Sequence, residues 1–320
     1  MRKLLLGTTA LAAAATMTAN VAVADVAISG SYEFAYKSQS SNITALDGTT
    51  FTTDSEVVLS FTNKTDSGLT VGMVTEIETD DADTAINEGS MSISGGFGKL
   101  VLGGNDGAAN NYSTIALSLI QEEMMDAGNS ASINMKNTEV AGSDANKVSY
   151  HLPAMGGLTA GASFTNASAA GNADTTEFGM KYSMSAGGAS ITIGGGQATT
   201  ENSTQDIDQQ NLGLKVVSGN ISAALSQGSY EGSSIDETST SAAVSFKVSD
   251  VMTVGAFTTE VEDDSTSEEL QVSGVELAYT IAPGLSAVIN VEDYDYKVGT
   301  SSGNTADSGT TSKLTIKASF

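Results

Sequence analysis

The stretch Ser312–Phe320, with the sequence SKLTIKASF, decides the fold. Apolar and polar side chains take turns along it: Leu314, Ile316, Ala318 and Phe320 alternate with Lys313, Thr315, Lys317 and Ser319. Successive side chains of a β-strand point to opposite faces of the sheet. The stretch is therefore predicted to be a strand with one apolar and one polar face.

The same alternation recurs along the rest of the chain. We count sixteen such segments, near residues 26–38, 51–63, 68–80, 87–95, 98–104, 145–152, 157–165, 174–184, 188–199, 206–217, 219–231, 236–248, 251–262, 268–281, 284–297 and 308–320. An even number of segments, each about ten residues long, is typical of bacterial outer-membrane barrels. In segment 268–281 the alternation slips phase near Gly274, which predicts a bulge or a shifted start. The expected fold class is all-β, a 16-stranded antiparallel transmembrane β-barrel.

The connections between these segments alternate in length. Short turns such as Ser218-Gly219 and Ser249-Asp250 alternate along the chain with longer polar stretches such as 39–50 and 298–307. Gly, Ser and Asp are the residues that tight turns prefer. Short turns on one rim and long loops on the other are typical of an up-and-down barrel in the outer membrane, and they place both termini on the periplasmic side.

One connection is much longer than the others. After the segment that ends near Gly103, alternation resumes only at Lys147. A loop of this length inside a compact domain is usually functional. Within it, Ile115, Leu119, Met124 and Met125 are spaced as on one face of a helix, which predicts a short helix in the range 112–127.

The first residues are predicted to be a secretory signal peptide. Arg2 and Lys3 precede an apolar run that begins at Leu4, and small residues lead up to Ala24. This arrangement predicts cleavage after Ala24. We therefore expect residues 1–24 to be a cleaved signal peptide and residues 25–320 to be the transmembrane barrel domain.

The composition is strongly acidic, with 38 Asp plus Glu against 13 Lys plus Arg and a formal net charge of -25. Phosphate backbones are bound by clustered Lys and Arg, so this balance argues against nucleic acid as a partner and favours cations. Arg2 is the only arginine, and it lies in the predicted signal peptide. The chain has no Cys, so a large hydrogen-bonded sheet would have to stabilise the exported protein without disulfides.

These features together resemble the general bacterial porin family. The start Asp25-Val26-Ala27-Ile28-Ser29-Gly30 and the run Gly-Phe-Gly-Lys-Leu at 96–100 are similar to those of alphaproteobacterial porins in particular. The resemblance covers the whole predicted mature chain. It implies that the long third external loop folds into the barrel and narrows it. It also implies that three barrels associate into a homotrimer and that the barrel-assembly machinery reads Phe320 as an assembly signal.

The resemblance further implies a constriction at which carboxylates of the infolded loop face cations on the opposite wall. The loop candidates are Asp106, Glu122, Glu123, Asp126, Glu139 and Asp144. Rings of Asp and Glu are a known physical basis of cation preference in pores. Taken singly, each of these acids is explained equally well as a solvated surface residue.

The polar phase of the strands points a second set of side chains toward the lumen. They are Lys37, Glu76, Glu78, Lys147, Lys181, Lys215, Lys247, Lys313 and Lys317. A lysine on the lipid face at mid-depth would cost about 2–4 kcal/mol, so we expect these lysines to be solvated by water inside the barrel. The family commonly uses arginines on this wall, and their lack here argues against a strong transverse field.

Neither catalytic nor metal-binding constellations compete with this interpretation. His151 is the only histidine, and without a partner it makes neither a triad nor a metal site. The acidic runs Asp80-Asp81-Asp83 and Glu262-Asp263-Asp264 contain oxygen ligands of the kind that Ca²⁺ takes, or that cations use to bridge to lipopolysaccharide phosphates. They lack EF-hand spacing, and solvated acidic loops explain them as well. We expect no cofactor and no enzymatic activity.

The sequence is thus interpreted as a Gram-negative outer-membrane porin, a water-filled, cation-preferring channel for ion transport and passive diffusion of small hydrophilic solutes. Expected partners are outer-membrane lipid and lipopolysaccharide, the barrel-assembly machinery and further copies of the chain in a trimer. Two alternatives stay open, a secreted structural or adhesive β-protein and an outer-membrane enzyme barrel. An adhesive sandwich buries its apolar strand faces in its own core, whereas a barrel turns them outward to lipid.

Overall fold

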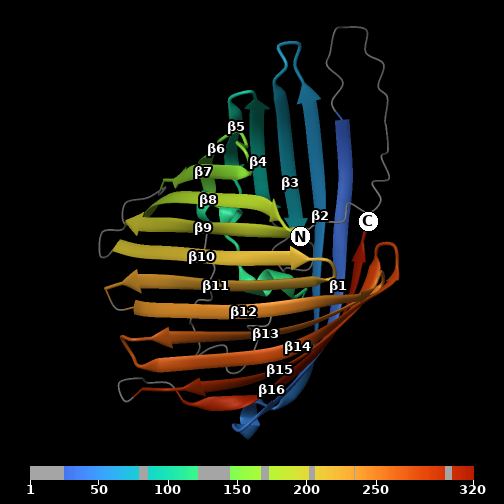
Figure 1. Cartoon of the computed structure of the whole chain (residues 1–320), viewed down its shortest axis with the longest axis vertical. Helices are drawn as coiled ribbons and strands as arrows, with labels where there is room; N and C mark the ends of the chain where they lie inside the picture. Colours follow the sequence, from blue (N-terminus) through green and yellow to red (C-terminus); the bar gives the residue numbers. More distant parts are fainter. Residues whose placement is uncertain are drawn as a thin grey trace.

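The strands of the protein close into a single antiparallel ring. The computed structural model describes residues 25–78, 86–121, 145–166, 173–201, 206–233, 235–299 and 305–320. Each strand pairs with its neighbours in sequence, and β1 (Asp25–Ser41) closes the ring by pairing with β16 (Asp307–Ser319). Figure 1 shows this succession of neighbouring strands from β1 to β16. The predicted 16-stranded antiparallel barrel is confirmed.

The remaining strands agree with the alternating segments to within a few residues at each end. They are β2 (Gly48–Lys64), β3 (Thr70–Glu78), β4 (Ile86–Gly95), β5 (Gly98–Gly104), β6 (Asn146–His151), β7 (Leu158–Thr165), β8 (Asp174–Ala186), β9 (Ala189–Glu201), β10 (Asp206–Ser218), β11 (Ile221–Gly232), β12 (Ile235–Ser249), β13 (Met252–Asp263), β14 (Glu268–Ala282) and β15 (Leu285–Lys297). A 3₁₀ turn at Thr44–Leu46 lies between β1 and β2. Period-2 alternation is thus a sufficient guide to these strands.

The two faces of the wall differ in polarity, with the apolar face outward. Val275 and Leu212 are exposed to 58% and 63%, whereas Ser241 and Thr315, which belong to the polar phase of their strands, are fully buried at 0%. A sandwich would show the opposite, because its apolar strand faces form its core. This distribution therefore contradicts the adhesive-sandwich alternative.

The outward apolar residues form a belt, and polar residues follow it toward the longer loops. On β15, Leu285, Ala287, Ile289 and Val291 face outward, and Asp293 and Asp295 continue the same face. A belt bounded in this way is the surface that a barrel presents to the hydrocarbon of a membrane. Among the helices in the described ranges, none is long and apolar enough to cross a membrane.

The predicted bulge or shifted start near Gly274 is wrong. β14 begins at Glu268, and Gly274 pairs in unbroken register with Phe257 on β13 and Glu292 on β15. The register shift of β14 lies instead between Thr280 and Ala282. The apparent slip arises because Leu270 and Val272 face inward and join an apolar cluster inside the barrel. Apolar residues therefore move from the outward to the inward positions of β14 there, although the backbone register is unbroken.

Over the described part of the predicted helix at 112–127, helical structure is limited to short turns. A single helical turn, α1 (Ala108–Tyr112), comes earlier, and a 3₁₀ turn follows at Ala116–Leu119. The backbone between them is extended at Ser113 and Ile115, so the two turns do not join into one helix. Residues 122–127 of the predicted helix lie outside the described residues. A short helix between β5 and β6 is confirmed, but its position is not.

Candidate functional site: the lumen and its inward loop

The long connection between β5 and β6 spans residues 105–145, and its described stretch 105–121 lies against the inner wall of the barrel. We call it loop L3; the structure describes it at 105–121 and at 145. Its helix α1 contacts β6, β7, β8 and β9, and its 3₁₀ turn contacts β10, β11 and β12. Figure 1 shows this teal segment behind β8 to β12. L3 therefore follows the wall around a large part of the ring.

Glycines on the inner face of β8, β9 and β10 make room for the backbone of L3. A Cβ atom at Gly179, Gly194, Gly196 or Gly213 would lie within 3.0 Å of a backbone oxygen of L3, contributed by Ala108, Tyr112, Ala109 and Thr114 respectively. Real Cβ atoms do not approach so closely. We call these four residues the glycine track. Glycine inside a strand often marks such a close approach of another backbone, and this signal was available in the sequence.

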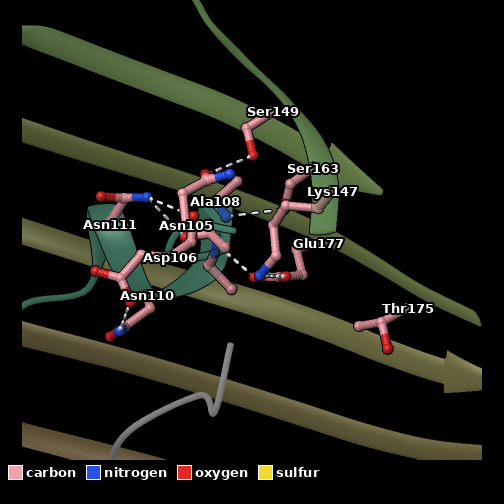
Figure 2. Close-up of polar contacts among 12 residues, drawn as sticks. Asn105, Asp106, Ala108, Asn110, Asn111, Lys147, Ser149, Ser163, Thr175 and Glu177 are labelled. Atoms are coloured by element: carbon pink, nitrogen blue, oxygen red, sulfur yellow. Dashed lines mark hydrogen bonds and ion pairs between the residues drawn. The ribbon is translucent and has the colours of Figure 1, made fainter. Parts of the chain in front are cut away.

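The start of L3 is fixed by a buried ion pair. Glu177 on β8 accepts a hydrogen bond from the backbone N–H of Ala109 at 3.2 Å and pairs with Lys147 on β6 at 3.4 Å. The Ser163 hydroxyl on β7 accepts a hydrogen bond from the backbone N–H of Ala108 at 2.9 Å. Figure 2 shows these side chains converging on the beginning of α1. A carboxylate suits this position, because the first N–H groups of a helix have no partner within it.

The middle of L3 is bound to β6 and β10. The Tyr112 hydroxyl and His151 Nδ1 share a hydrogen bond of 2.8 Å, which gives the lone histidine a structural role. Burial raises the pKa of the Tyr112 hydroxyl, so the phenol stays protonated near neutral pH. One residue further, Ser113 and Asn211 exchange hydrogen bonds of 2.9 and 2.6 Å, and Asn211 Oδ1 also accepts from the backbone N–H of Gly196.

The 3₁₀ turn of L3 packs on an apolar cluster inside the lumen. The buried members are Ala116, Ile120, Ala224, Ala243, Phe257, Val261, Leu270, Val272, Tyr294 and Tyr296. The cluster reaches from L3 across β11, β12, β13, β14 and β15. Apolar side chains on the inner face of a water-filled barrel would be unfavourable, but here L3 removes them from water. The apolar residues that disturbed the alternation on β14 are part of this contact.

The described stretch of L3 ends in polar contacts with β14 and β16. Both carboxylate oxygens of Glu276 accept a hydrogen bond from the backbone N–H of Gln121, at 3.0 and 2.9 Å. Lys317 donates to the carbonyl oxygen of Gln121 at 3.2 Å and forms an ion pair with Glu33 on β1 at 3.0 Å. These contacts bind L3 to the strands that close the ring.

Of the loop acids predicted to form the constriction, the described residues include only Asp106. It is exposed at the start of L3, and its carboxylate accepts a hydrogen bond from the Asn110 side chain at 3.2 Å. Asp106 thereby supports the first turn of α1. The other candidates, Glu122, Glu123, Asp126, Glu139 and Asp144, lie outside the described residues.

The predicted lumen-wall residues occupy the inward phase of their strands, in different environments. Lys37 and Lys313 are cross-strand neighbours on β1 and β16, and Glu76 and Glu78 lie on the inward face of β3. Lys247 pairs with Asp250 in the following turn at 2.8 Å, and its hydrogen bond and charge lower the pKa of that carboxyl. Lys147 differs from the prediction of a solvated lysine, since it is 4% exposed. Its burial follows from the contact of Glu177 with α1, which covers both side chains.

A group of inward acidic side chains lies on β1, β2 and β3, beside inward lysines of β1 and β16. Glu33 on β1 is the cross-strand neighbour of Asp54 on β2, and Glu56 on β2 is the neighbour of Glu78 on β3. Lys181, Lys215 and Lys247 lie on β8, β10 and β12, about half the ring away. Sequence reasoning missed the roles of Glu33, Asp54 and Glu56, although each has the same inward phase as a residue it named.

The acidic run Glu262-Asp263-Asp264 does not converge on one point. Asp263 faces inward and is buried, where it accepts hydrogen bonds from the hydroxyls of Ser265 and Thr266, whereas Glu262 belongs to the outward phase. Within the described part of the chain, no group of three metal-ligating residues is close enough to hold an ion. Asp80, Asp81 and Asp83 lie outside the described residues.

The fold and the site together define a class of protein, a β-barrel channel with an apolar outer belt, a polar inner wall and a loop folded into the lumen. A family model described as Gram-negative porin matches residues 7–301. The chain belongs to the Gram-negative porin family, whose members are non-enzymatic channels of the outer membrane. This excludes the alternative of an enzyme barrel.

Solved structures share the architecture at low sequence identity. An anion-selective porin from Comamonas acidovorans has a TM-score of 0.68 at 16% identity, over 93% of this chain and 100% of that one. The trimer form of OmpT from Vibrio cholerae has a TM-score of 0.67 at 14% identity, over 93% and 100% of the two chains. A mutant of Rh. blastica porin has a TM-score of 0.66 at 15% identity, over 92% and 100%. No curated protein sequence matches the chain.

Proposed function

We propose that this porin forms a water-filled, cation-preferring channel for the passive diffusion of small hydrophilic solutes and ions. The observation that supports the proposal most directly is a group of inward carboxylates on β1, β2 and β3, which we call the acidic wall. The described stretch of L3 is bound to other strands of the ring, from β6 to β12 and at β14 and β16. Carboxylates that line a pore lower the energy of a cation in it and raise that of an anion. The excess of 38 acids over 13 bases acts in the same direction.

The chain's export and assembly belong to the same proposal. Residues 1–24 would be cleaved as a signal peptide and 25–320 would form the mature barrel, which would be similar to alphaproteobacterial porins. Three copies would associate in the outer membrane, in contact with lipid and lipopolysaccharide. This assembly is supported by the fold shared with a neighbour that is described as a trimer form.

Ion preference is tested by the reversal potential of single channels in planar bilayers under a KCl gradient. We expect stable, ohmic current steps and a reversal potential whose sign is that of the potassium equilibrium potential. Neutralising the loop acids together, as Glu122→Gln, Glu123→Gln and Asp126→Asn, should move that potential toward zero. A reversal potential with the sign of the chloride equilibrium potential would contradict cation preference. Folded protein that gives no conductance would contradict the open channel.

A matched control removes the same charge from the outside of the barrel. Glu260, Asp293 and Asp295 are outward-phase acids beyond the apolar belt on β13 and β15. Exposed charges separated by more than a Debye length, about 8 Å at physiological ionic strength, are largely screened. The variant Glu260→Gln, Asp293→Asn, Asp295→Asn should therefore keep the reversal potential of the unmodified channel. An equal shift of the reversal potential in both variants would mean that the cation preference depends only on the net charge of the protein.

A further inference from the structure

The lumen contains a second polar site, separate from the acidic wall. A cavity of about 1000 Å³ lies between L3 and the inner faces of β8 to β12. L3 contributes Ser113, Thr114 and Ser118 to its lining, and the strands contribute lysines and hydroxyl groups. The cavity is therefore bounded by L3 on one side and by the barrel wall on the other.

Two lysines line this cavity, and within the described ranges neither forms an ion pair. Lys181 donates to the carbonyl oxygen of Asn111 at 3.2 Å, and it lies near enough to Lys215 for the two charges to repel. Among the described residues, no carboxylate forms an ion pair with either side chain. Other inward lysines are treated differently, since Lys147, Lys247 and Lys317 each have a carboxylate within 4.0 Å. Lys181 and Lys215 therefore present two ammonium groups to one cavity, and no carboxylate in the described part of the chain pairs with them.

Hydroxyl groups line the same cavity as the two lysines. Thr192 on β9 is the cross-strand neighbour of both Lys215 on β10 and Ser183 on β8, and the Ser183 and Thr192 hydroxyls are 3.2 Å apart. Ser222 and Ser245 are cross-strand neighbours on β11 and β12 and also line the cavity. Ammonium and hydroxyl groups both donate hydrogen bonds, and a charged acceptor makes such bonds stronger. This donor set is complementary to an oxyanion.

We propose that Lys181, Lys215 and the neighbouring hydroxyls form a binding subsite for the oxyanion group, carboxylate or phosphate, of a small solute passing through the channel. The proposal rests on the proposed diffusion function and adds to it a chemical class of solute. The acidic wall of β1 to β3 favours cations along the free lumen, whereas this subsite lies beside L3 and holds an anionic group locally. Solutes that contain an oxyanion group would then pause at this subsite during their passage.

The test uses inorganic phosphate as the probe and the refolded full barrel in planar bilayers at about 0.1 M KCl, where the Debye length is about 10 Å. We expect phosphate to reduce the potassium current in a saturable way, with half-saturation in the millimolar range. Lys215→Gln removes one charged donor and should raise the half-saturating concentration about tenfold, the change that corresponds to a loss of about 1.4 kcal/mol. Lys215→Arg should retain the block. Lys215 is itself a lumen-wall charge, so the phosphate-free current of each variant is recorded first and the block is expressed as a fraction of that variant's own current.

Lys297→Gln is the matched control, since Lys297 lies on the outward phase of β15 and pairs with Glu269. It should keep the phosphate block of the unmodified channel. Phosphorus NMR line broadening of phosphate by the protein in detergent gives a second readout that does not depend on conductance. A non-saturable block, or a block equal in Lys215→Gln and the unmodified channel, would overturn the subsite while ohmic conductance still supported the channel. Absence of conductance with phosphate binding retained would overturn the channel alone.

Discussion

At the scale of single residues, the absence of a side chain determines where L3 lies. The glycine track of Gly179, Gly194, Gly196 and Gly213 allows backbone to approach backbone across the inner wall. In most strand positions glycine weakens a sheet, because it adds no packing and loses more conformational freedom on folding. Here that cost is offset by contacts that no larger residue would allow. The track thus specifies the position of the loop without supplying a hydrogen bond from a side chain.

A methyl group placed on this track should displace L3. In Gly213→Ala the new Cβ would lie within 3.0 Å of the Thr114 carbonyl oxygen, which is backbone and does not rotate away. We expect L3 to move toward the barrel axis, with lower single-channel conductance and a loss of about 1–3 kcal/mol, as for overpacked sites. Conductance and the free energy of unfolding in urea measure the two effects.

Gly232→Ala provides the comparison. Gly232 lies at the end of β11, and its Cβ would meet Ile207 at 3.5 Å, an ordinary van der Waals contact. Its conductance should equal that of the unmodified channel. Equal conductance for Gly213→Ala as well would show that L3 does not depend on the track.

At the scale of elements, the ion pair between Lys147 and Glu177 connects α1 to β6 and β8. Both side chains are almost fully buried, at 0% and 1% exposure. Such a pair adds little net stability when intact, because desolvation opposes the attraction between the charges. Its value lies in position, since Glu177 also accepts the hydrogen bond of Ala109.

Removal of one partner should be costly. Lys147→Met leaves the Glu177 carboxylate buried without a counter-charge, and we expect a loss of about 3–5 kcal/mol. Adding Glu177→Gln should recover part of that loss, because the remaining group is neutral and its amide oxygen still accepts from Ala109. Urea unfolding of the two variants in lipid vesicles checks this order. A double variant less stable than Lys147→Met would contradict the interpretation of a buried charge.

The strands could be predicted from the sequence and the path of L3 could not. A strand in a barrel wall faces lipid on one side and a polar lumen on the other, so each residue reports its own face. L3 does not separate lipid from water, so its sequence does not alternate, and its structure depends on the wall atoms that it contacts. Ile115 and Leu119 therefore resemble a helical face in the sequence, although their positions result from contacts with β10 to β12. Leu270 and Val272 misled for the same reason.

For the candidate site, the sequence predicts which side chains point into the lumen but not which groups they contact. Inward positions of Lys181, Lys215 and Lys317 follow from alternation, and their partners do not, because those partners lie on other strands or on L3. Lys147 and Lys317 are both inward lysines, yet one is buried beneath α1 and the other joins Glu33 to Gln121. Pairing of this kind depends on the tertiary structure.

At the scale of the whole molecule, the ring closes where its two ends meet. Phe320 exchanges backbone hydrogen bonds with Gly30, at 2.9 and 3.3 Å, and its side chain is 72% exposed on the outer surface. The side chain contributes little to closure, which the backbone provides. A role in recognition by the barrel-assembly machinery is compatible with this exposure and remains a prediction.

Phe320→Ala should separate assembly from stability. We expect less folded protein in the outer membrane of producing cells, whereas the same variant folded into detergent in vitro should conduct as the unmodified channel does. Phe246→Ala, which removes another outward aromatic residue from β12, should reach normal levels in cells. Normal cellular levels of Phe320→Ala would remove Phe320 from the assembly signal.

The many attachments of L3 bear on how a cell would regulate uptake through this channel. Swinging the described stretch of L3 away from the wall would break the Glu177, Asn211 and Glu276 contacts together and expose the apolar cluster to water. Local opening is frequent only where few contacts are lost, and here several hydrogen bonds and an apolar contact would be lost at once. The aperture beside this stretch is therefore a constant of the protein rather than a valve. A bacterium that needs more or less of a nutrient would adjust how many copies it synthesises, not how far each one opens.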